Sequence, residues 1–190
     1  MRRITLDIET TNATVGGAFD PSTMNLTVAC IHDTETDAFT SYTVEELPKL
    51  WPIFERADLL VGYNSDHFDI PILNRYYPGD LSKIRSLDLL AEIKNVLGRR
   101  IKLDSVAEGT LGKKKSGNGL DAIKWWNEGK KDKVIQYCID DVRITKDIYE
   151  YALKNGHLKY RELGSLHEVK IDTKNWSAPQ SGAVTYTLGF

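Results

Sequence analysis

The stretch ITLDIETT, residues 4–11, alternates apolar and polar side chains with the two-residue period of a half-buried β-strand. On such a strand, Asp7 and Glu9 project from the same face, next to each other. Two adjacent carboxylates repel, and each tends to stay protonated unless a positive group holds it. The stretch therefore predicts a strand that places two acids beside a cation, which the rest of the chain has to identify.

Length and composition set broad bounds on the protein. The 190 residues fit one domain, with an ordinary 41% hydrophobic and 27% charged content. The formal net charge of −2 does not indicate a nucleic-acid-binding protein, but carboxylates gathered at a metal site would lower it without excluding one. Cys30 and Cys138 lack zinc-binding spacing and suit a reducing compartment. Without a signal-peptide core or a run of ~20 apolar residues, a cytoplasmic protein with no membrane partner is expected.

Hydrophobic periodicity predicts a mixed α/β chain. The expected strands begin near Met1 and cover 25–33, 38–44 and 58–64; the expected helices cover 44–56, 67–77, 86–97, 103–112, 120–129 and 130–156, and a hairpin follows in 157–172. Thr43 and Glu46 form a capping box for the first helix, and Gly156 ends the last one. Antiparallel-type strands followed by alternating helices and strands indicate a mixed sheet, with the first strand at its centre.

The long helix expected over 130–156 distinguishes the two acids of the pair Asp140–Asp141. Its apolar stripe consists of Val134, Cys138, Ile144, Ile148 and Ala152. Asp141 and Tyr137 lie within or beside that stripe, one turn apart, whereas Asp140 falls on the polar face. An inward carboxylate has to be ion-paired, hydrogen-bonded or bound to metal, so these roles stay open for Asp141.

The segment VGYNSDHFDIP, residues 61–71, adds two acids at the expected start of a helix. Acids at that end of a helix cap free N–H groups, so a structural role is open for both. Asp66 lies at the position of a cap, whereas Asp69 lies within the first turn. Asn64, at the end of the preceding strand, is interpreted as a local organiser.

Carboxylates from three separated segments can thus converge on one site: Asp7, Glu9, Asp69 and Asp141. Sites built only from carboxylate oxygens suit hard cations such as Mg²⁺ and Mn²⁺. A metal ion is therefore the expected partner of the two acids on the first strand, in preference to a basic side chain.

Three motifs of the chain resemble the exonuclease motifs of the DEDD superfamily: LDIET (6–10), NSDHFD (64–69) and YCIDD (137–141). Asn64 and Asp69 match the Asn-x-x-x-Phe-Asp pattern of the proofreading domains of family B DNA polymerases. Tyr137 and Asp141 match the Tyr-x-x-x-Asp motif of the tyrosine subfamily, DEDDy. The histidine subfamily would have a histidine where Gln136 stands.

The resemblance covers about residues 1–155 and implies an α/β, ribonuclease H-like exonuclease domain, with a mixed central β-sheet flanked by α-helices. It leaves residues 156–190 as a short β-rich C-terminal extension, expected to be a hairpin plus a tail. Proofreading domains precede a polymerase, and this chain has no polymerase domain, so a stand-alone protein is expected.

By this resemblance the catalytic residues are Asp7, Glu9, Asp69, Tyr137 and Asp141. The carboxylates would hold two Mg²⁺ or Mn²⁺ ions: Asp7 would contact both, Glu9 and Asp141 would complete the first site, and Asp69 would hold the second. Tyr137 would orient the attacking water, because a tyrosine pKa of about 10 makes a poor base at neutral pH. The implied reaction is 3′–5′ exonucleolytic hydrolysis of single-stranded nucleic acid with a free 3′ end, releasing nucleoside 5′-monophosphates.

The candidate substrate contacts are Thr10, Thr11, Asn64, Phe68, Lys113, Lys114 and Lys115. Thr10 ends the first motif and Thr11 follows it, where the backbone can meet the terminal nucleotide. The lysines belong to a basic, glycine-containing loop that suits phosphate contacts and equally suits a solvated surface. DNA and RNA are not distinguished, because single residues do not reveal contacts to a 2′-hydroxyl group.

Three alternatives remain open at this stage. One is an inactive or weakly active ribonuclease H-like module that binds nucleic acid or a partner protein, and another is an endonuclease or resolvase on the same fold. The third is a haloacid-dehalogenase-type phosphatase, whose first motif is Asp-x-Asp-x-Thr. The chain has Glu9 where that chemistry needs an aspartic acid, and its paired acids lie within a helix beside Tyr137.

Overall fold

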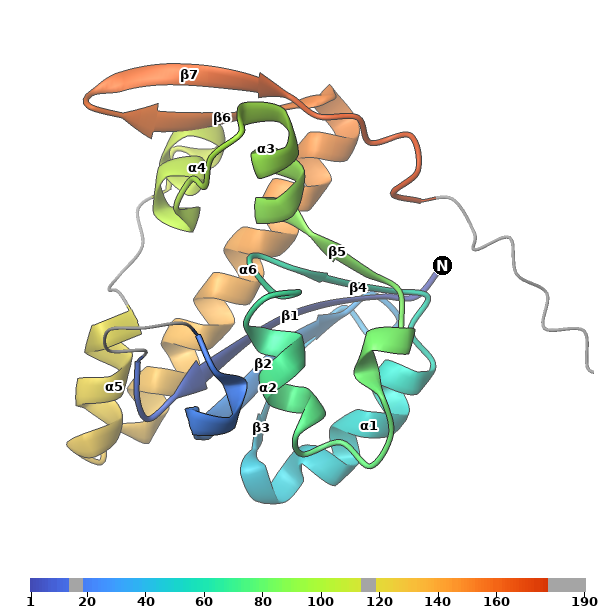
Figure 1. The fold of residues 1–190 in the computed structure, drawn as a ribbon, viewed down its shortest axis with the longest axis vertical. Helices are drawn as coiled ribbons and strands as arrows, with labels where there is room; N and C mark the ends of the chain where they lie inside the picture. Colours follow the sequence, from blue (N-terminus) through green and yellow to red (C-terminus); the bar gives the residue numbers. More distant parts are fainter. Residues whose placement is uncertain (14–18, 114–118, 178–190) are drawn as a thin grey trace, which may run out of the picture.

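A five-stranded mixed sheet forms the centre of the computed structural model, which describes residues 1–13, 19–113 and 119–177 (Figure 1). Its strands are β1 (Arg3–Thr10), β2 (Leu26–Asp33), β3 (Ala38–Thr43), β4 (Leu59–Gly62) and β5 (Ser86–Asp88). Their order is β3-β2-β1-β4-β5; the β1–β2 and β2–β3 pairs are antiparallel, and the β1–β4 and β4–β5 pairs are parallel. The predicted mixed α/β sheet with the first strand at its centre is confirmed.

Helices cover both faces of this sheet. They are α1 (Leu47–Glu55), α2 (Asp69–Asn74), α3 (Leu89–Leu97), α4 (Leu103–Leu111), α5 (Gly119–Asn127) and α6 (Lys131–Asn155). α1 and α2 pack on one face, and α6 crosses the other face, where it contacts β1 and β2 (Figure 1). The expected hairpin is formed by β6 (His157–Glu162), which packs against α4 and α6, and β7 (Ser165–Lys170), which packs against α3.

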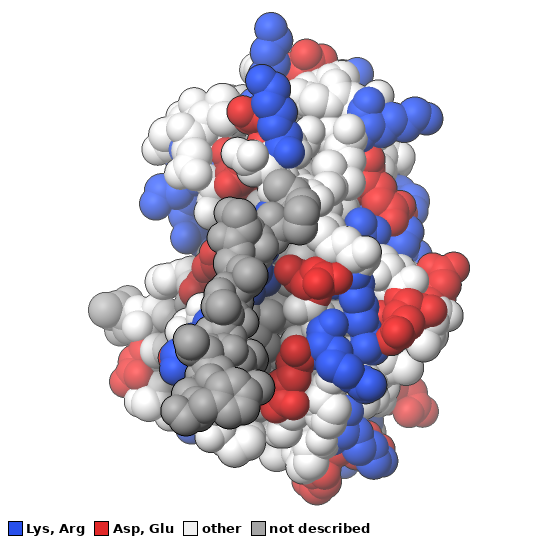
Figure 2. All heavy atoms as spheres, turned by 90° about the vertical axis from the view of Figure 1, so that its right-hand side faces the viewer, with Lys and Arg blue, Asp and Glu red and all other residues white. Residues whose placement is uncertain are grey.

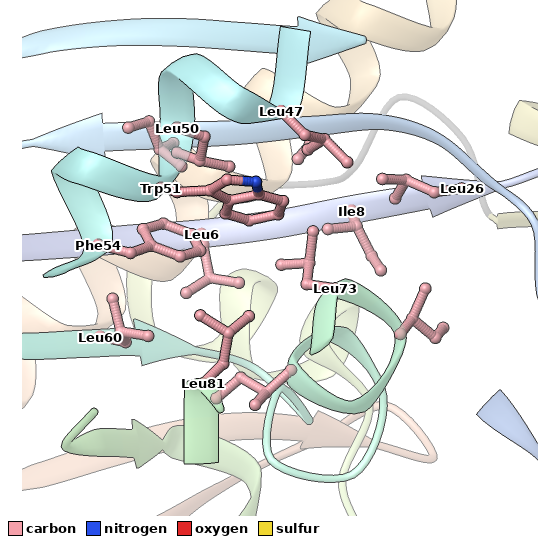
Figure 3. Close-up of a cluster of buried hydrophobic side chains, with 14 of the residues drawn as sticks. Leu6, Ile8, Leu26, Leu47, Leu50, Trp51, Phe54, Leu60, Leu73 and Leu81 are labelled. Atoms are coloured by element: carbon pink, nitrogen blue, oxygen red, sulfur yellow. The ribbon is translucent and has the colours of Figure 1, made fainter. Parts of the chain in front are cut away.

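The two-residue period of β1 decides what lies on each face of the sheet. Ile4, Leu6 and Ile8 point into a buried apolar cluster with α1 and α2, beneath Trp51 and Phe54 (Figure 3). Burying an isoleucine or leucine side chain of this kind contributes about 1.5–3 kcal/mol. The alternate side chains of β1 therefore point toward the opposite face, which α6 covers.

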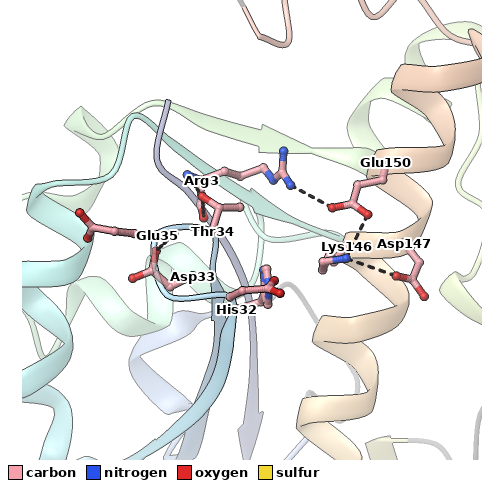
Figure 4. A network of polar contacts seen from close by, with 9 residues as sticks. Arg3, His32, Asp33, Thr34, Glu35, Lys146, Asp147 and Glu150 are labelled. Carbon is pink, nitrogen blue, oxygen red and sulfur yellow. Dashed lines mark hydrogen bonds and ion pairs between the residues drawn. The ribbon is translucent and has the colours of Figure 1, made fainter.

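Contacts at two positions along α6 hold this helix against β1. Near the start of β1, Arg3 Nη2 lies 3.1 Å from Glu150 Oε1 (Figure 4), and the guanidinium lies 4.5 Å from the centroid of the Tyr149 ring. About three turns earlier along α6, the Cys138 thiol donates to the carbonyl oxygen of Asp7 at 3.4 Å. These contacts set which residues of α6 face the acidic side of β1.

Residues 86–88 form a strand, so the prediction that a helix begins at residue 86 is wrong. Ser86 and Asp88 pair with Leu60 and Gly62 of β4. The Asp88 carboxylate then accepts the backbone N–H of Leu90, at 2.9 Å, and starts α3 one residue later. A strand of three residues is too short to show a two-residue period. The helical pattern of 89–97 therefore dominates the prediction for the whole segment.

Two other helices begin later than predicted. Residues 44–46 form a 3₁₀ turn, and α1 starts only after it, although the predicted Thr43–Glu46 capping box is present. α2 covers Asp69–Asn74 within the expected 67–77, and its N-cap residue is Phe68. The prediction of Asp66 as the cap is therefore wrong, because a loop with Asn64 in the left-handed region (φ 68°) delays the start of the helix.

Charged side chains of both signs are interspersed on the face that Figure 2 shows. Many charges of the protein are paired, for example Arg99 Nη2 with Glu162 Oε2 at 2.7 Å. Exposed pairs of this kind contribute at most about 1 kcal/mol each, so they keep the surface balanced more than they hold the fold together. Among the described residues, none of the helices has the length and apolarity to cross a membrane.

Gly109 in α4 lies directly against the backbone of β6. A Cβ atom at this position would lie 2.5 Å from Cα and 2.6 Å from the backbone nitrogen of Tyr160. Because backbone atoms of a packed strand cannot rotate out of the way, a side chain at residue 109 would push α4 and β6 apart.

We therefore expect Gly109→Ala to lower the free energy of unfolding by about 1–3 kcal/mol, as overpacking of a core does. Urea denaturation followed by circular dichroism measures the change. Gly119→Ala is the matched control, since a Cβ there meets no atom within 4 Å. The control should leave stability unchanged or raise it by up to about 1 kcal/mol through helix propensity. Equal stabilities of the two variants would contradict the close packing of α4 and β6.

Candidate active site

Three carboxylates meet toward the C-terminal end of β1. Asp7 and Glu9 come from β1 and Asp141 from the middle of α6, and one carboxylate oxygen of each lies within 4.8 Å of the others. Glu9 and Asp141 are only 8% and 5% exposed, and Asp7 is half-buried. Buried like charges this close repel unless they bind protons or a cation, and an all-oxygen set suits a hard divalent ion. The chemistry of the donor set therefore fits a metal site.

The helical period of α6 decides which of two adjacent acids joins this group. Asp141 points inward, whereas the side chain of Asp140 is 36% exposed. Asp140 Oδ1 accepts from Gln136 Nε2 at 2.9 Å and lies 3.3 Å from Arg143 Nη1. The two acids lie on the inward and outward faces as the sequence predicted.

Asp69 approaches the same group from the edge of β1. Its Oδ1 atom accepts the backbone N–H of Ile8 at 3.0 Å. β4 pairs with β1 only along Arg3–Thr5, so the side chain of Asp69 takes the position that a longer neighbouring strand would occupy. Because Ile8 lies between the two acids of β1, this bond holds Asp69 next to them, although it lies outside the 4.8 Å cluster.

Burial is the main cause of a raised pKa at the carboxyl group of Asp69. The side chain is 3% exposed, and its burial, together with the nearby carboxylates of Asp88 and Asp141, raises the pKa of its carboxyl group to about 8. The hydrogen bond from Ile8 acts in the opposite direction. In the absence of a cation, Asp69 therefore holds a proton at neutral pH, and a bound divalent ion would displace it.

Tyr137 lies one turn before Asp141 on the inward face of α6. It is 4% exposed, and its ring packs edge-on against Trp125 of α5 with centroids 5.9 Å apart. Nζ of the exposed Lys133 lies 4.0 Å from the centroid of the same tryptophan ring. The packing fixes the tyrosine ring, so its orientation beside the carboxylates is set by α5 as well as by α6.

One cavity of about 660 Å³ joins these groups. Its lining includes all five predicted catalytic residues: Asp7, Glu9, Asp69, Tyr137 and Asp141. Met24, Phe68 and Ile123 add apolar surface on the same lining. A hollow of equal volume beside Met1 and Arg85 lacks a comparable carboxylate cluster among the described residues. A concave site with an apolar wall and converging polar groups is typical of small-molecule and substrate sites.

Three predicted substrate contacts line this cavity: Thr10, Asn64 and Phe68. The hydroxyl of Thr10 donates to the carbonyl oxygen of Asn12 at 2.7 Å, which holds the turn after β1. Asn64 donates its backbone N–H to Asp88 Oδ1 at 2.7 Å, and its side-chain oxygen accepts from Arg100 Nη2 at 2.6 Å. Asn64 thus organises its loop, as expected, and also reaches the cavity.

Among the described residues, the other two predicted contacts, Thr11 and Lys113, do not line the cavity. The backbone N–H of Thr11 donates to the carbonyl oxygen of Asn25 at 2.8 Å and closes a turn. Lys113 Nζ lies 2.7 Å from Asp147 Oδ2 of α6, so its charge is already paired. Lys114 and Lys115 lie outside the residues that the structure describes.

Asp88 is the main residue of this region that the sequence did not single out. It is 6% exposed, and besides capping α3 it accepts the backbone N–H groups of Asn64 and Asp66. Burial raises the pKa of its carboxyl group against these hydrogen bonds. An aspartate directly before an apolar helical pattern is an N-cap signal, and this signal was available in the sequence. Arg100 and Lys102 gave no such signal, because only the tertiary fold brings them to Asn64 and the cavity.

Comparison with known proteins agrees with this architecture. The family profile described as the RNase H superfamily matches residues 4–153. The chain belongs to this superfamily. No curated protein matches the chain.

The fold of this superfamily member is also similar to a solved polymerase structure. The family B DNA polymerase from the hyperthermophilic archaeon Pyrobaculum calidifontis superimposes with a TM-score of 0.61 and 21% sequence identity. The match covers 80% of this chain and 24% of the polymerase chain, so the chain spans about a quarter of that protein's length. At this identity the likeness shows the fold, and the ribonuclease H-like fold predicted from the sequence is confirmed.

Metal binding at the carboxylate cluster can be tested with the adjacent acids of α6. We expect Mn²⁺ to raise the melting temperature of the wild-type protein and of Asp140→Asn, but not that of Asp141→Asn, because only Asp141 belongs to the cluster. Differential scanning calorimetry with and without excess EDTA measures the shift. An equal shift in both variants would place the ion elsewhere.

The raised pKa of Asp69 predicts a pH dependence of stability in EDTA. The unfolded chain releases this proton near pH 3.9, whereas the folded protein keeps it up to about pH 8. The contribution of Asp69 to stability should therefore be fully present below about pH 4 and be lost as pH rises through this window, by on the order of a few kcal/mol. Asp69→Asn should flatten the profile, and Asp140→Asn should keep it. Urea titrations between pH 5 and 9 would contradict this if Asp69→Asn followed the wild type.

Proposed function

We propose that this protein is a metal-dependent 3′–5′ exonuclease of the DEDDy type. It hydrolyses the terminal phosphodiester of single-stranded nucleic acid and releases nucleoside 5′-monophosphates. The observation that carries the proposal is the single cavity lined by four carboxylates and Tyr137, drawn from β1, α2 and α6. Membership of the RNase H superfamily supports a nuclease-type function, and the fold shared with a family B DNA polymerase supports the comparison with proofreading domains.

Two Mg²⁺ or Mn²⁺ ions are the proposed cofactors. Asp7, Glu9 and Asp141 would hold one ion, and Asp7 with Asp69 would hold the other. Bound there, divalent ions supply an easily deprotonated water and neutralise charge on the leaving 3′-oxygen. The protein itself contributes the burial of these carboxylates, which excludes competing water and strengthens their attraction for cations.

Tyr137 is proposed to orient the attacking water through its hydroxyl group. Its ring is fixed by Trp125 and by its buried position on α6, so a hydrogen bond from it has a defined direction. Holding a nucleophile in line with the scissile bond removes part of the entropic cost of reaching the transition state. The terminal base would lie against the apolar wall that includes Phe68 and Ile123.

The proposed catalytic domain comprises residues 1–155, with 156–190 as its C-terminal extension. Within the described part of that extension, Leu158, Tyr160 and Val169 of the hairpin are buried against α4 and α6. Trp176 stacks on Tyr149 with ring centroids 5.3 Å apart. The extension therefore shares a core with the domain, and we infer that it stabilises α6 in the position that presents Asp141.

The proposed activity is tested with a 5′-labelled single strand of DNA or RNA and Mg²⁺ or Mn²⁺. We expect a ladder of products shortened from the 3′ end, no products in EDTA, and loss of at least about 10³-fold in rate for Asp7→Ala. Tyr137→Phe should lose about 10–100-fold because it only misorients the water. Asp140→Ala, whose carboxylate faces solvent, should retain wild-type activity.

Each rival function gives a distinct result in the same set of assays. Ladders that persist in EDTA or in Asp7→Ala would refute the proposal. Cleavage of a circular strand would indicate an endonuclease, and hydrolysis of a small phosphomonoester alone would indicate a phosphatase. Tight binding of a strand without turnover in either metal would indicate an inactive binding module.

A further inference from the structure

A second, smaller hollow adjoins the candidate active-site cavity. Its volume is about 280 Å³, and Asn64 lines both hollows, so one opens beside the other. Lys94 of α3 and Arg100, from the loop between α3 and α4, line the smaller hollow. Lys102, two residues further on, lines the larger cavity. Basic side chains thus follow the boundary between the two hollows.

Arg100 is anchored at this boundary by a chain of hydrogen bonds. Its Nη2 atom donates to Asn64 Oδ1 at 2.6 Å, and the backbone N–H of Asn64 donates to Asp88 Oδ1 at 2.7 Å. Asp88 is buried and held in turn by the N-terminus of α3. The guanidinium therefore has a defined position, although the side chain is exposed. Among the described residues, its side chain donates only to this neutral amide, so other N–H donors stay available to a ligand.

Among the described residues, neighbouring carboxylates form no ion pairs with these basic side chains. Within the described parts of the chain, Lys94, Arg100 and Lys102 form no ion pair, whereas the adjacent Arg99 is paired with Glu162. The acids on the smaller hollow are Asp66, which is exposed, and Asp88. Asp88 accepts backbone N–H groups from Asn64, Asp66, Leu90 and Ala91, which offset its charge.

We propose that Arg100 and Lys94 form a subsite for two neighbouring backbone phosphates of the substrate strand, upstream of the scissile bond. The inference rests on the proposed function, and it assigns the route by which the strand leaves the carboxylate cavity. A strand carries one negative charge per nucleotide and is repelled by acids, so cations along its path lower the cost of placing its end there. An anchored guanidinium suits a phosphate because its N–H donors match two phosphate oxygens.

The subsite predicts that binding depends on strand length and on salt, but not on sequence, because phosphate contacts carry no base information. A substrate with only the scissile phosphate, thymidine 5′-(p-nitrophenyl phosphate), cannot occupy the subsite. A strand of ten nucleotides can occupy it. Removing the two cations should therefore weaken the strand far more than the small ester.

The experiment compares Lys94→Ala/Arg100→Ala with a control double variant, Lys154→Ala/Lys170→Ala. The control removes equal charge from exposed side chains at the far end of α6 and on β7 (Figure 1). Affinity for a ten-nucleotide single strand with a phosphorothioate 3′ linkage is measured by fluorescence anisotropy in Ca²⁺ at several salt concentrations. KM values for the unmodified strand and for the small ester are measured in Mg²⁺.

For the Lys94→Ala/Arg100→Ala variant we expect the slope of log Kd against log salt to decrease by about 1.4, corresponding to two lost phosphate contacts on a single strand. KM should rise at least about fivefold more for the strand than for the ester. Lys94→Ala alone, which breaks no hydrogen bond seen in the described residues, should lower the slope by about 0.7 and guards against misfolding of the loop.

Equal slopes for both double variants would overturn the subsite, even if the wild-type enzyme degrades the strand. An equal rise in KM for strand and ester would overturn it as well, because the two cations would then act at the scissile phosphate. Absence of hydrolysis by the wild type would refute the proposed exonuclease, while the salt slopes in Ca²⁺ would still decide whether the subsite binds a strand.

Discussion

The crossing of α6 over the acidic face of β1 is the constraint on which the rest of the structure depends. Successive side chains of β1 point to opposite faces, so Leu6 and Ile8 can be buried only if Asp7 and Glu9 face the other way. α6 covers that other face and is held there by the contact of Arg3 with Glu150 (Figure 4) and by its contact with the Tyr149 ring. A shift of one residue in β1 would expose the core and remove both acids from the site together. The site is therefore as well determined as the core itself.

This arrangement gathers carboxylates at a cost to the metal-free protein. Asp69 is held by the N–H of Ile8 at the place where β4 ends, and burial raises the pKa of its carboxyl group. Like charges in a low-dielectric site repel strongly, so their repulsion lowers the free energy of unfolding of the metal-free protein. A cation that binds only the folded protein would offset this repulsion and raise the free energy of unfolding. Stability and metal affinity are therefore linked through the same residues.

The near-neutral total charge does not show how paired charges are distributed over the surface. Arg99 and Lys113 are engaged with Glu162 and Asp147, and the face in Figure 2 carries both signs. Beside the carboxylate cavity, by contrast, Arg100 has only a neutral amide partner among the described residues. Local fields decide how a charged ligand approaches, so an overall charge of −2 says little about affinity for nucleic acid.

Features that depend on local periodicity could be read directly from the residues. The alternation of β1 placed two acids on one face, the helical stripe of α6 separated Asp141 from Asp140, and the motif order indicated the fold. These patterns misplaced the start of α3 and the cap of α2, because a strand of three residues and a left-handed Asn64 leave no periodic trace.

Which distant segments meet became known only from the three-dimensional fold. The bond of Asp69 to Ile8, the pairing of Lys113 with Asp147, and the anchoring of Arg100 all join residues at least 34 positions apart. Local patterns record which face a residue occupies. They do not record what lies opposite, because that depends on how the whole chain packs.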